Sequence, residues 1–179
     1  MEKPLSADPD LAVETVRGWY RPDNQLFQYE GGRLLCAALP VFTEAVAAKF
    51  SSVAAIGSDQ DIAFILDTMP NYRGDAAILP VLMEIASRLQ PNDARLEKVE
   101  LCIEATDVVS GAFGFVDAHR AKKAVLQPWL DDARAPVKAF VAECIRRLDL
   151  RIASEQRTAE QRQEQRRLDY DGSDEPKGG

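Results

Sequence analysis

The sequence contains few of the residues that bind metals or form disulfides. Its three cysteines, Cys36, Cys102 and Cys144, are far apart in the chain, and its single histidine is His119. A structural zinc site needs clustered cysteine or histidine ligands, and a disulfide framework needs paired cysteines in an oxidising compartment. Each cysteine lies in an apolar segment, where a free thiol behaves as a small hydrophobic group. We therefore expect buried thiols and no metal or other cofactor.

Long uncharged apolar runs are absent from the sequence. None approaches the roughly 20 residues that a membrane-spanning helix requires. Residues 1–10 also lack the basic start and the apolar run of a secretory signal peptide. We therefore expect a cytoplasmic protein that has no membrane partner.

Aromatic residues make up only 7% of the chain, whereas alanine and leucine are abundant. This balance favours packed helices over sheets. No segment alternates apolar and polar residues between hairpin turns, so we expect no strand. With 179 residues and a hydrophobic content of 46%, the chain is long enough to bury a proper core. The composition therefore predicts an all-α fold built as one domain with tails.

Apolar residues recur at every third or fourth position through most of the chain, and proline and glycine interrupt this rhythm. Asp8 or Asp10 is expected to cap the first helix, and Ser58 with Asp61 resembles a capping box. Pro40 is expected to kink or divide the second helix. The predicted helices cover about residues 10–20, 34–50, 58–69, 75–89, 93–103, 111–130 and 133–168.

The apolar stripe of the last predicted helix fades after Ile152. Beyond it, residues 154–167 are nearly all polar but are strong helix formers, so this part of the helix cannot be buried. It is either a solvated tail or linker, or a docking arm for an acidic protein surface or for phosphates. The predicted organisation is a flexible N-terminus at 1–9, a helical domain at 10–152, an exposed charged helix extension at 153–168 and a disordered tail at 169–179.

The start of that last helix follows a known pattern. Asp131 and Asp132 precede Val137 and Lys138, and apolar residues follow at helical spacing, namely Phe140, Val141, Cys144, Ile145 and Leu148. This pattern resembles the second helix of a HEAT repeat, in which an aspartate turn caps the helix and a broad apolar stripe meets the neighbouring helices. Residues 58–89 form a second, irregular unit, whose turn contains Asn71-Tyr-Arg-Gly74.

The resemblance implies antiparallel helical hairpins that stack as a short, irregular HEAT-like array and end in a long charged helix. Proteins with such folds mostly serve as scaffolds or adaptors that hold a protein or a nucleic acid on a curved surface. An ordinary helical bundle is the alternative architecture. Fold alone does not establish function.

Charge is distributed unevenly along the chain. The net charge is −7, yet residues 134–168 contain nine lysines and arginines against five acids. Such a chain can steer a charged partner toward one end. The candidate binding residues all lie in this basic region: Arg146, Arg147, Arg151, Arg157, Arg162, Arg166 and Arg167.

Two groups of residues superficially resemble ligand sites. Gly111 and Gly114 lack the preceding strand and the following lysine of a phosphate-binding loop, so we expect close helix packing there. Asp59, Asp61 and Asp67 lack the glycine and the final glutamate of a calcium loop, so we expect them to be capping charges. No serine or cysteine nucleophile has a recognisable base, and no catalytic residue is assigned.

These observations favour a non-enzymatic protein–protein interaction module, which is an adaptor, a scaffold or the terminal module of a larger assembly. Its expected partner is another protein. One alternative is a nucleic-acid-associated protein whose arginines contact phosphates. The other is an enzyme on a helical scaffold, which requires a deep pocket with several convergent ionisable groups. The oligomeric state is left open.

Overall fold

The computed structural model describes residues 8–21, 30–72, 75–104, 111 and 113–171. Within these ranges the chain is helical and contains no strand, so the predicted all-α fold is confirmed. The elements are α1 (Pro9–Trp19), α2 (Gly32–Ala38), α3 (Glu44–Ile56), α4 (Asp59–Thr68), η3 (Met69–Tyr72), η4 (Ala76–Ile78), α5 (Leu79–Arg88), α6 (Arg95–Glu104), α7 (Gly114–Leu126), η5 (Gln127–Asp131) and α8 (Ala135–Asp171), where η marks a 3-10 helix.

Helix α1 begins at the first of the two positions that the sequence pattern allowed. The Asp8 carboxylate accepts the backbone N–H of Leu11 at 3.0 Å, and Pro9 occupies the first helical position, where its missing N–H costs nothing. Asp8 is therefore the capping residue, and not Asp10. The N-terminal segment expected to be flexible at 1–9 thus already contains the start of a helix, and residues 1–7 lie outside the described part of the chain.

The other predicted boundaries follow local chemistry. The capping box at the start of α4 is confirmed, because Ser58 Oγ accepts the Asp61 N–H and Asp61 Oδ2 accepts the Ser58 N–H at 2.7 Å. The helix predicted at 34–50 is divided into α2 and α3 around Pro40, and Thr43 caps the second half. The helix predicted at 111–130 begins only at Gly114 and tightens into η5 at its end.

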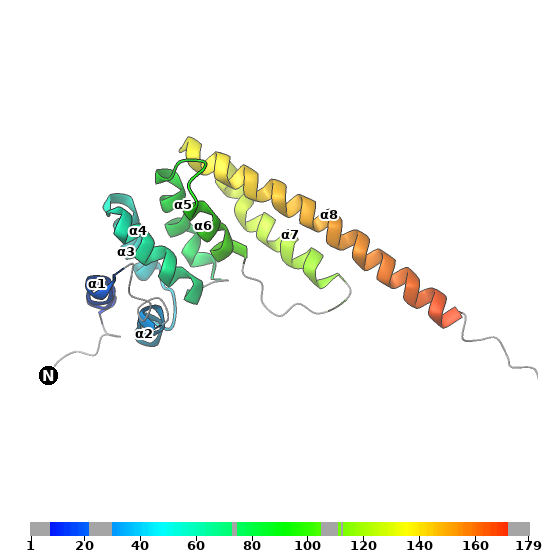
Figure 1. The fold of residues 1–179 in the computed structure, drawn as a ribbon, viewed down its shortest axis with the longest axis horizontal. Helices are drawn as coiled ribbons and strands as arrows, with labels where there is room; N and C mark the ends of the chain where they lie inside the picture. The colour runs from blue at the N-terminus through cyan, green and yellow to red at the C-terminus, as the bar shows by residue number, and fades with distance from the viewer. Residues whose placement is uncertain (1–7, 22–29, 73–74, 105–110, 112, 172–179) are drawn as a thin grey trace, which may run out of the picture.

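Two hydrophobic clusters build the molecule, and α5 belongs to both. Val81, Leu82 and Ile85 pack into the first cluster with residues of α1–α4 and α6. Leu79 and Met83 pack into the second cluster with residues of α7 and α8. A helix that is apolar on nearly all sides must be covered by other elements. Figure 1 shows this arrangement, with α1–α4 at one end, α5 and α6 in the middle and the α7–α8 hairpin at the other end.

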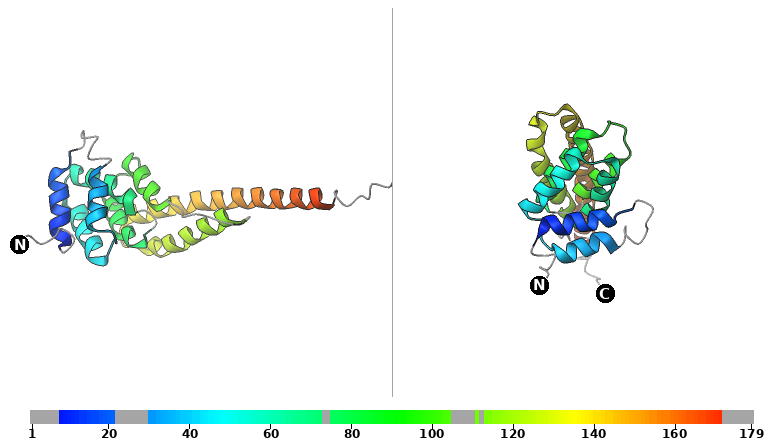
Figure 2. Two further views of the ribbon diagram at one scale, coloured as in Figure 1. Left: turned by 90° about the horizontal axis from the view of Figure 1, so that it is seen from below. Right: turned by 90° about the vertical axis from the view of Figure 1, so that its left-hand side faces the viewer.

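Helices α7 and α8 lie antiparallel, and α8 projects far beyond α7 (Figures 1 and 2). Lys123 of α7 forms an ion pair with Asp149 of α8 at 2.6 Å, and Ala159 of α8 is buried at 4% exposure. The packed part of α8 therefore extends past Ile152, whereas residues 160–167 are exposed. The helix itself continues to Asp171.

Two predicted boundaries in the last helix consequently need correction. The exposed extension begins after Ala159 and not at residue 153, because alanine packs closely against a neighbouring helix although it adds little to an apolar stripe. The tail expected to be disordered at 169–179 is helical through Asp171. Residues 172–179 lie outside the described part of the chain.

The central position of α5 leads to a prediction about stability. Ile85 is fully buried, at 0% exposure, whereas Ile56 at the end of α3 is 86% exposed. We expect Ile85→Ala to lower the free energy of unfolding by about 2–5 kcal/mol and the control Ile56→Ala to lower it by less than about 0.5 kcal/mol. Met83→Ala, which removes a contact of the second cluster, is expected to shift the same single transition. Urea unfolding followed by circular dichroism measures both effects, and two separate transitions would contradict the shared role of α5.

Candidate functional site

A groove of about 310 Å³ lies between α6 and α8, and α5 forms its floor. Its lining comes from the end of α5, the connection at residues 91–94, the first part of α6 and residues 136–147 of α8. The connection between α5 and α6 is short, and Pro91 follows the last turn of α5 directly. The first part of α6 thus lies across the groove from residues 136–147 of α8. Residues distant in the sequence are thereby brought together.

The floor of the groove is apolar and tightly packed. Ala86 and Leu89 of α5 are buried, and so is Cys144 of α8. Phe140 of α8 is partly buried and packs against both hydrophobic clusters. Its ring therefore lies at the junction of the two halves of the molecule and faces a space that no other side chain of the described residues fills.

The two walls of the groove differ in chemistry. The α6 side presents Asp93, Glu97 and Glu100, and the last two lie one turn apart on the same helix face. The α8 side is apolar at Ala139 and Phe140 and becomes charged only towards its far end. One wall is therefore acidic and the other is largely hydrophobic.

Arg147 closes the far end of the groove. Its Nε donates to Glu143 Oε1 at 2.8 Å on the same helix, and its Nη1 donates to Glu100 Oε2 across the groove on α6. The Glu100 side chain is only 13% exposed, so its carboxylate needs a cation nearby. Hydrogen bonds from Arg146 and then Arg147 lower the pKa of Glu143 to about 2.

Further ion pairs hold the walls in place. Arg134 Nη1 donates to Glu84 Oε2 at 2.5 Å and so ties the start of α8 to α5. Asp132 accepts the backbone N–H of Arg134 at 2.8 Å, and the Arg134 guanidinium lowers the pKa of Asp132 to about 2. Asp132 therefore stabilises the turn before α8, but the N–H that it accepts lies just before the helix, which begins at Ala135. On the α6 side, Arg95 bridges Asp93 and Asp59.

The seven arginines proposed from the sequence do not form one surface. Arg146 and Arg147 are engaged with Glu143, and only Arg147 lines the groove. At 3.6 residues per turn, Arg151, Arg162 and Arg166 share one face of α8, whereas Arg157 and Arg167 lie on other faces. Acidic residues are interleaved with them, and residues 135–171 contain eight lysines and arginines against seven acids. The positive excess of residues 134–168 is therefore small over the whole of α8.

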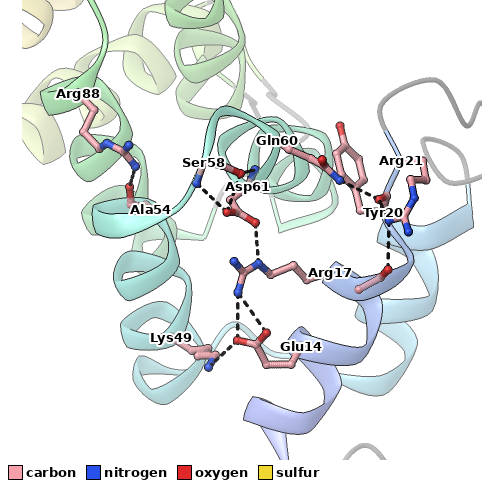
Figure 3. A network of polar contacts seen from close by, with 11 residues as sticks. Glu14, Arg17, Tyr20, Arg21, Lys49, Ala54, Ser58, Gln60, Asp61 and Arg88 are labelled. Atoms are coloured by element: carbon pink, nitrogen blue, oxygen red, sulfur yellow. Dashed lines mark hydrogen bonds and ion pairs between the residues drawn. The ribbon is translucent and has the colours of Figure 1, made fainter.

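A second cluster of charged residues connects α1 with α3 and α4 (Figure 3). Glu14 accepts from Lys49 at 2.8 Å and from Arg17 at 3.1 Å, and Arg17 Nε donates to Asp61 Oδ1 at 2.6 Å. The hydrogen bond from Arg17 lowers the pKa of Asp61, and that from Lys49 lowers the pKa of Glu14. All four side chains are therefore held in ion pairs, and the cluster fastens α1 to the core.

The acids that could have formed a cation site each face a basic side chain. Asp59 pairs with Arg95, and Asp61 pairs with Arg17. Asp67 accepts from Lys98 at 2.9 Å. Among the residues that the structure describes, no group of three or more histidine, cysteine or acidic side chains is arranged to hold a metal ion.

Cysteine and glycine have different roles here. Cys102 and Cys144 are buried as expected, Cys36 is only partly buried, and burial raises the pKa of Cys102 to about 11. Thiols of this kind are poor nucleophiles. The expectation of close helix packing at Gly111 is wrong, because no atom lies near the position of a side chain there. Its φ of +88° instead requires glycine for conformational reasons.

The comparisons with known proteins give no further information about the site. No protein-family model matches the sequence, and no curated protein and no solved structure matches it either. The resemblance to HEAT repeats therefore depends on the residues around Asp131–Leu148 alone. Within the described ranges, no helix combines the length and the apolar character of a membrane span.

The charged cluster of Figure 3 leads to a prediction about pH dependence. Asp61→Asn removes the charged partner of Arg17 and weakens the capping box with Ser58, so we expect it to cost about 1–3 kcal/mol at neutral pH. Because the folded state lowers the pKa of Asp61 below its usual 3.8, its contribution is complete above that pH and is lost as the pH falls through the lower folded value. The difference in stability between Asp61→Asn and the wild type should therefore become smaller at acidic pH. Thermal unfolding from pH 7 to pH 2 measures it.

Asp59→Asn is the matched control, because the Asp59 side chain is 83% exposed. We expect this change to alter stability by less than about 0.5 kcal/mol at every pH. If Asp61→Asn were destabilised by the same amount at every pH, the result would contradict a stabilising role for the charge of Asp61.

Proposed function

We propose that the chain is a non-enzymatic protein-binding module that holds a segment of another protein in the groove between α6 and α8. The observation that supports this function best is the groove itself, which is open, has an apolar floor and has charged groups only along its edges. Its volume of about 310 Å³ is at the lower end of the range for ligand pockets. That size suits one or two side chains of a partner.

Rigid walls also support a binding role. The Arg134–Glu84 pair fixes the start of α8 on α5, and Arg95 fixes the start of α6 through Asp93 and Asp59. A preformed groove loses little conformational freedom on binding, so more of the contact energy remains as affinity. Phe140 supplies the type of central aromatic anchor around which protein interfaces are usually organised.

The HEAT-like architecture belongs to the same proposal. Phe140 and Cys144 are part of the segment that resembles a HEAT helix, and both line the groove. Scaffold proteins of stacked helical hairpins bind their partners on surfaces between adjacent helices. A cytoplasmic adaptor is the role that combines these features. The arginines of α8 support a nucleic-acid partner less well, because acidic residues are interleaved with them along the helix.

A change that fills the groove tests this function. Ala139 is exposed and lines the groove, so Ala139→Trp adds a large ring there without entering the core. Short random peptides displayed on phage and selected on the wild-type chain should be enriched for a common motif. We expect the selected peptides to bind at least about tenfold more weakly to Ala139→Trp, which corresponds to about 1.4 kcal/mol. Ala142→Trp, on another exposed face of the same helix, is the control and should bind normally.

Failure to enrich any motif, or equal binding by Ala139→Trp and the wild type, would overturn the proposed function. Fluorescence anisotropy with the selected peptides distinguishes these results. Circular dichroism confirms that both tryptophan variants fold.

A truncation tests whether the projecting end of α8 takes part. A chain that ends at Ala159 retains every residue of the groove and the whole contact with α7, because residues 160–167 are exposed. We expect this chain to bind the selected peptides with an unchanged dissociation constant and to unfold within a few degrees of the full chain. A large loss of affinity on truncation would show that the projecting end contributes to binding.

A further inference from the structure

We infer that the groove selects a positively charged segment, in which an apolar side chain is flanked by lysine or arginine. This inference rests on the proposed function and specifies the ligand of the same site. The apolar side chain would pack on Phe140 and the floor, and the cations would face the acidic wall formed by α6.

The asymmetry of the two walls is the first argument. Of the residues that line the groove, four are carboxylates and one is a guanidinium, namely Asp93, Glu97, Glu100, Glu143 and Arg147. The chain as a whole is also acidic, with a net charge of −7. Complementary charge favours the binding of basic segments and disfavours the binding of acidic segments.

The pairing of these carboxylates shows where a cation would bind. Asp93 is held by Arg95, and Glu143 is held by Arg146 and Arg147. Glu97 forms no ion pair with any residue in the described part of the chain, and it is exposed at the middle of the α6 wall. Glu97 is therefore the first carboxylate that a basic side chain of a ligand meets.

Arg147 occupies the second cation position. Its guanidinium reaches from α8 to Glu100, whose side chain is 13% exposed and whose charge is costly without a counterion. The Arg147 side chain itself is 44% exposed, so it can move into solvent. A basic side chain of the ligand thus competes with Arg147 for Glu100.

The length of the groove limits the length of the segment. From Ala139 to Arg147 the α8 wall rises by about 12 Å at 1.5 Å per residue. An extended peptide covers that distance with about four residues. The groove therefore matches a short motif with one apolar anchor and cations close on either side.

A second copy of this chain is the main competing occupant, because the last turns of α8 contain several arginines. Residues 160–167 read Glu-Gln-Arg-Gln-Glu-Gln-Arg-Arg and include no apolar side chain that could fill the floor. Leu168 follows Arg167 in the sequence, so the oligomeric state is the measurement that distinguishes a second copy from a separate partner.

The experiment uses the full chain and three peptides that differ only in charge. Each peptide has one central leucine, flanked by arginine and lysine, by glutamine, or by glutamate. We expect fluorescence anisotropy to show the basic peptide binding at least about tenfold more tightly than the glutamine peptide, and the glutamate peptide binding most weakly.

Two variants of the groove test the assigned residues separately. Glu97→Gln should lower the affinity for the basic peptide about three- to tenfold and leave the affinity for the glutamine peptide unchanged. Arg147→Gln should raise the affinity for the basic peptide severalfold, since it removes a competitor for Glu100. Arg157→Gln is the matched control, because Arg157 is an exposed arginine of the same helix that does not line the groove, and it should leave the affinity unchanged.

The possible outcomes distinguish the proposed binding function from the selection of basic segments. Equal binding of the three peptides, still blocked by Ala139→Trp, overturns the selection of basic segments and leaves the proposed function intact. Binding of no peptide overturns both. A dimer seen by sedimentation and abolished by Ala139→Trp would assign the groove to a second copy and overturn the inference. The inference would also be overturned by a single-stranded RNA that displaces the basic peptide from the wild type but not from the chain ending at Ala159.

Discussion

The burial of α5 is the constraint on which the rest of the structure depends. Val81 and Ile85 face one hydrophobic cluster while Met83 faces the other, so α5 cannot lie at the surface of a stable fold. Helices α1–α4 and α6 cover one side, and α7 and α8 cover the other. Because α6 and α8 approach α5 from these two sides, their facing surfaces do not close completely, and the groove is the space that remains.

The helical fold could be predicted from the sequence because its signals are local. Asp8 and Ser58 each cap a helix through a backbone group three residues away, and Pro40 divides a helix at its own position. Such interactions depend on nearby residues and on little else. The end of the packed part of α8 was missed because Ala159 is small, and its burial depends on where α7 lies.

The groove could not be predicted in the same way, because its residues meet only after folding. Glu100 and Arg147 are far apart in the sequence, and nothing in either segment indicates that α6 lies beside α8. The sequence did identify Arg147, but as one of seven exposed arginines. Its role depends on the carboxylates around it. The pair Glu97 and Glu100 on one face of α6, together with Phe140 in an apolar stripe, was the available signal.

The continuity of α8 has a mechanical consequence. One unbroken helix connects the groove wall at Arg147 with Asp171, a distance of about 36 Å at 1.5 Å per residue. The packed part of the helix ends at Ala159, so its last 12 residues extend about 18 Å beyond the last buried position. A tilt of one degree at Ala159 displaces the tip by about 0.3 Å over that length. The packing of α8 through Ala159 therefore limits how far a movement of the groove wall is carried to the tip.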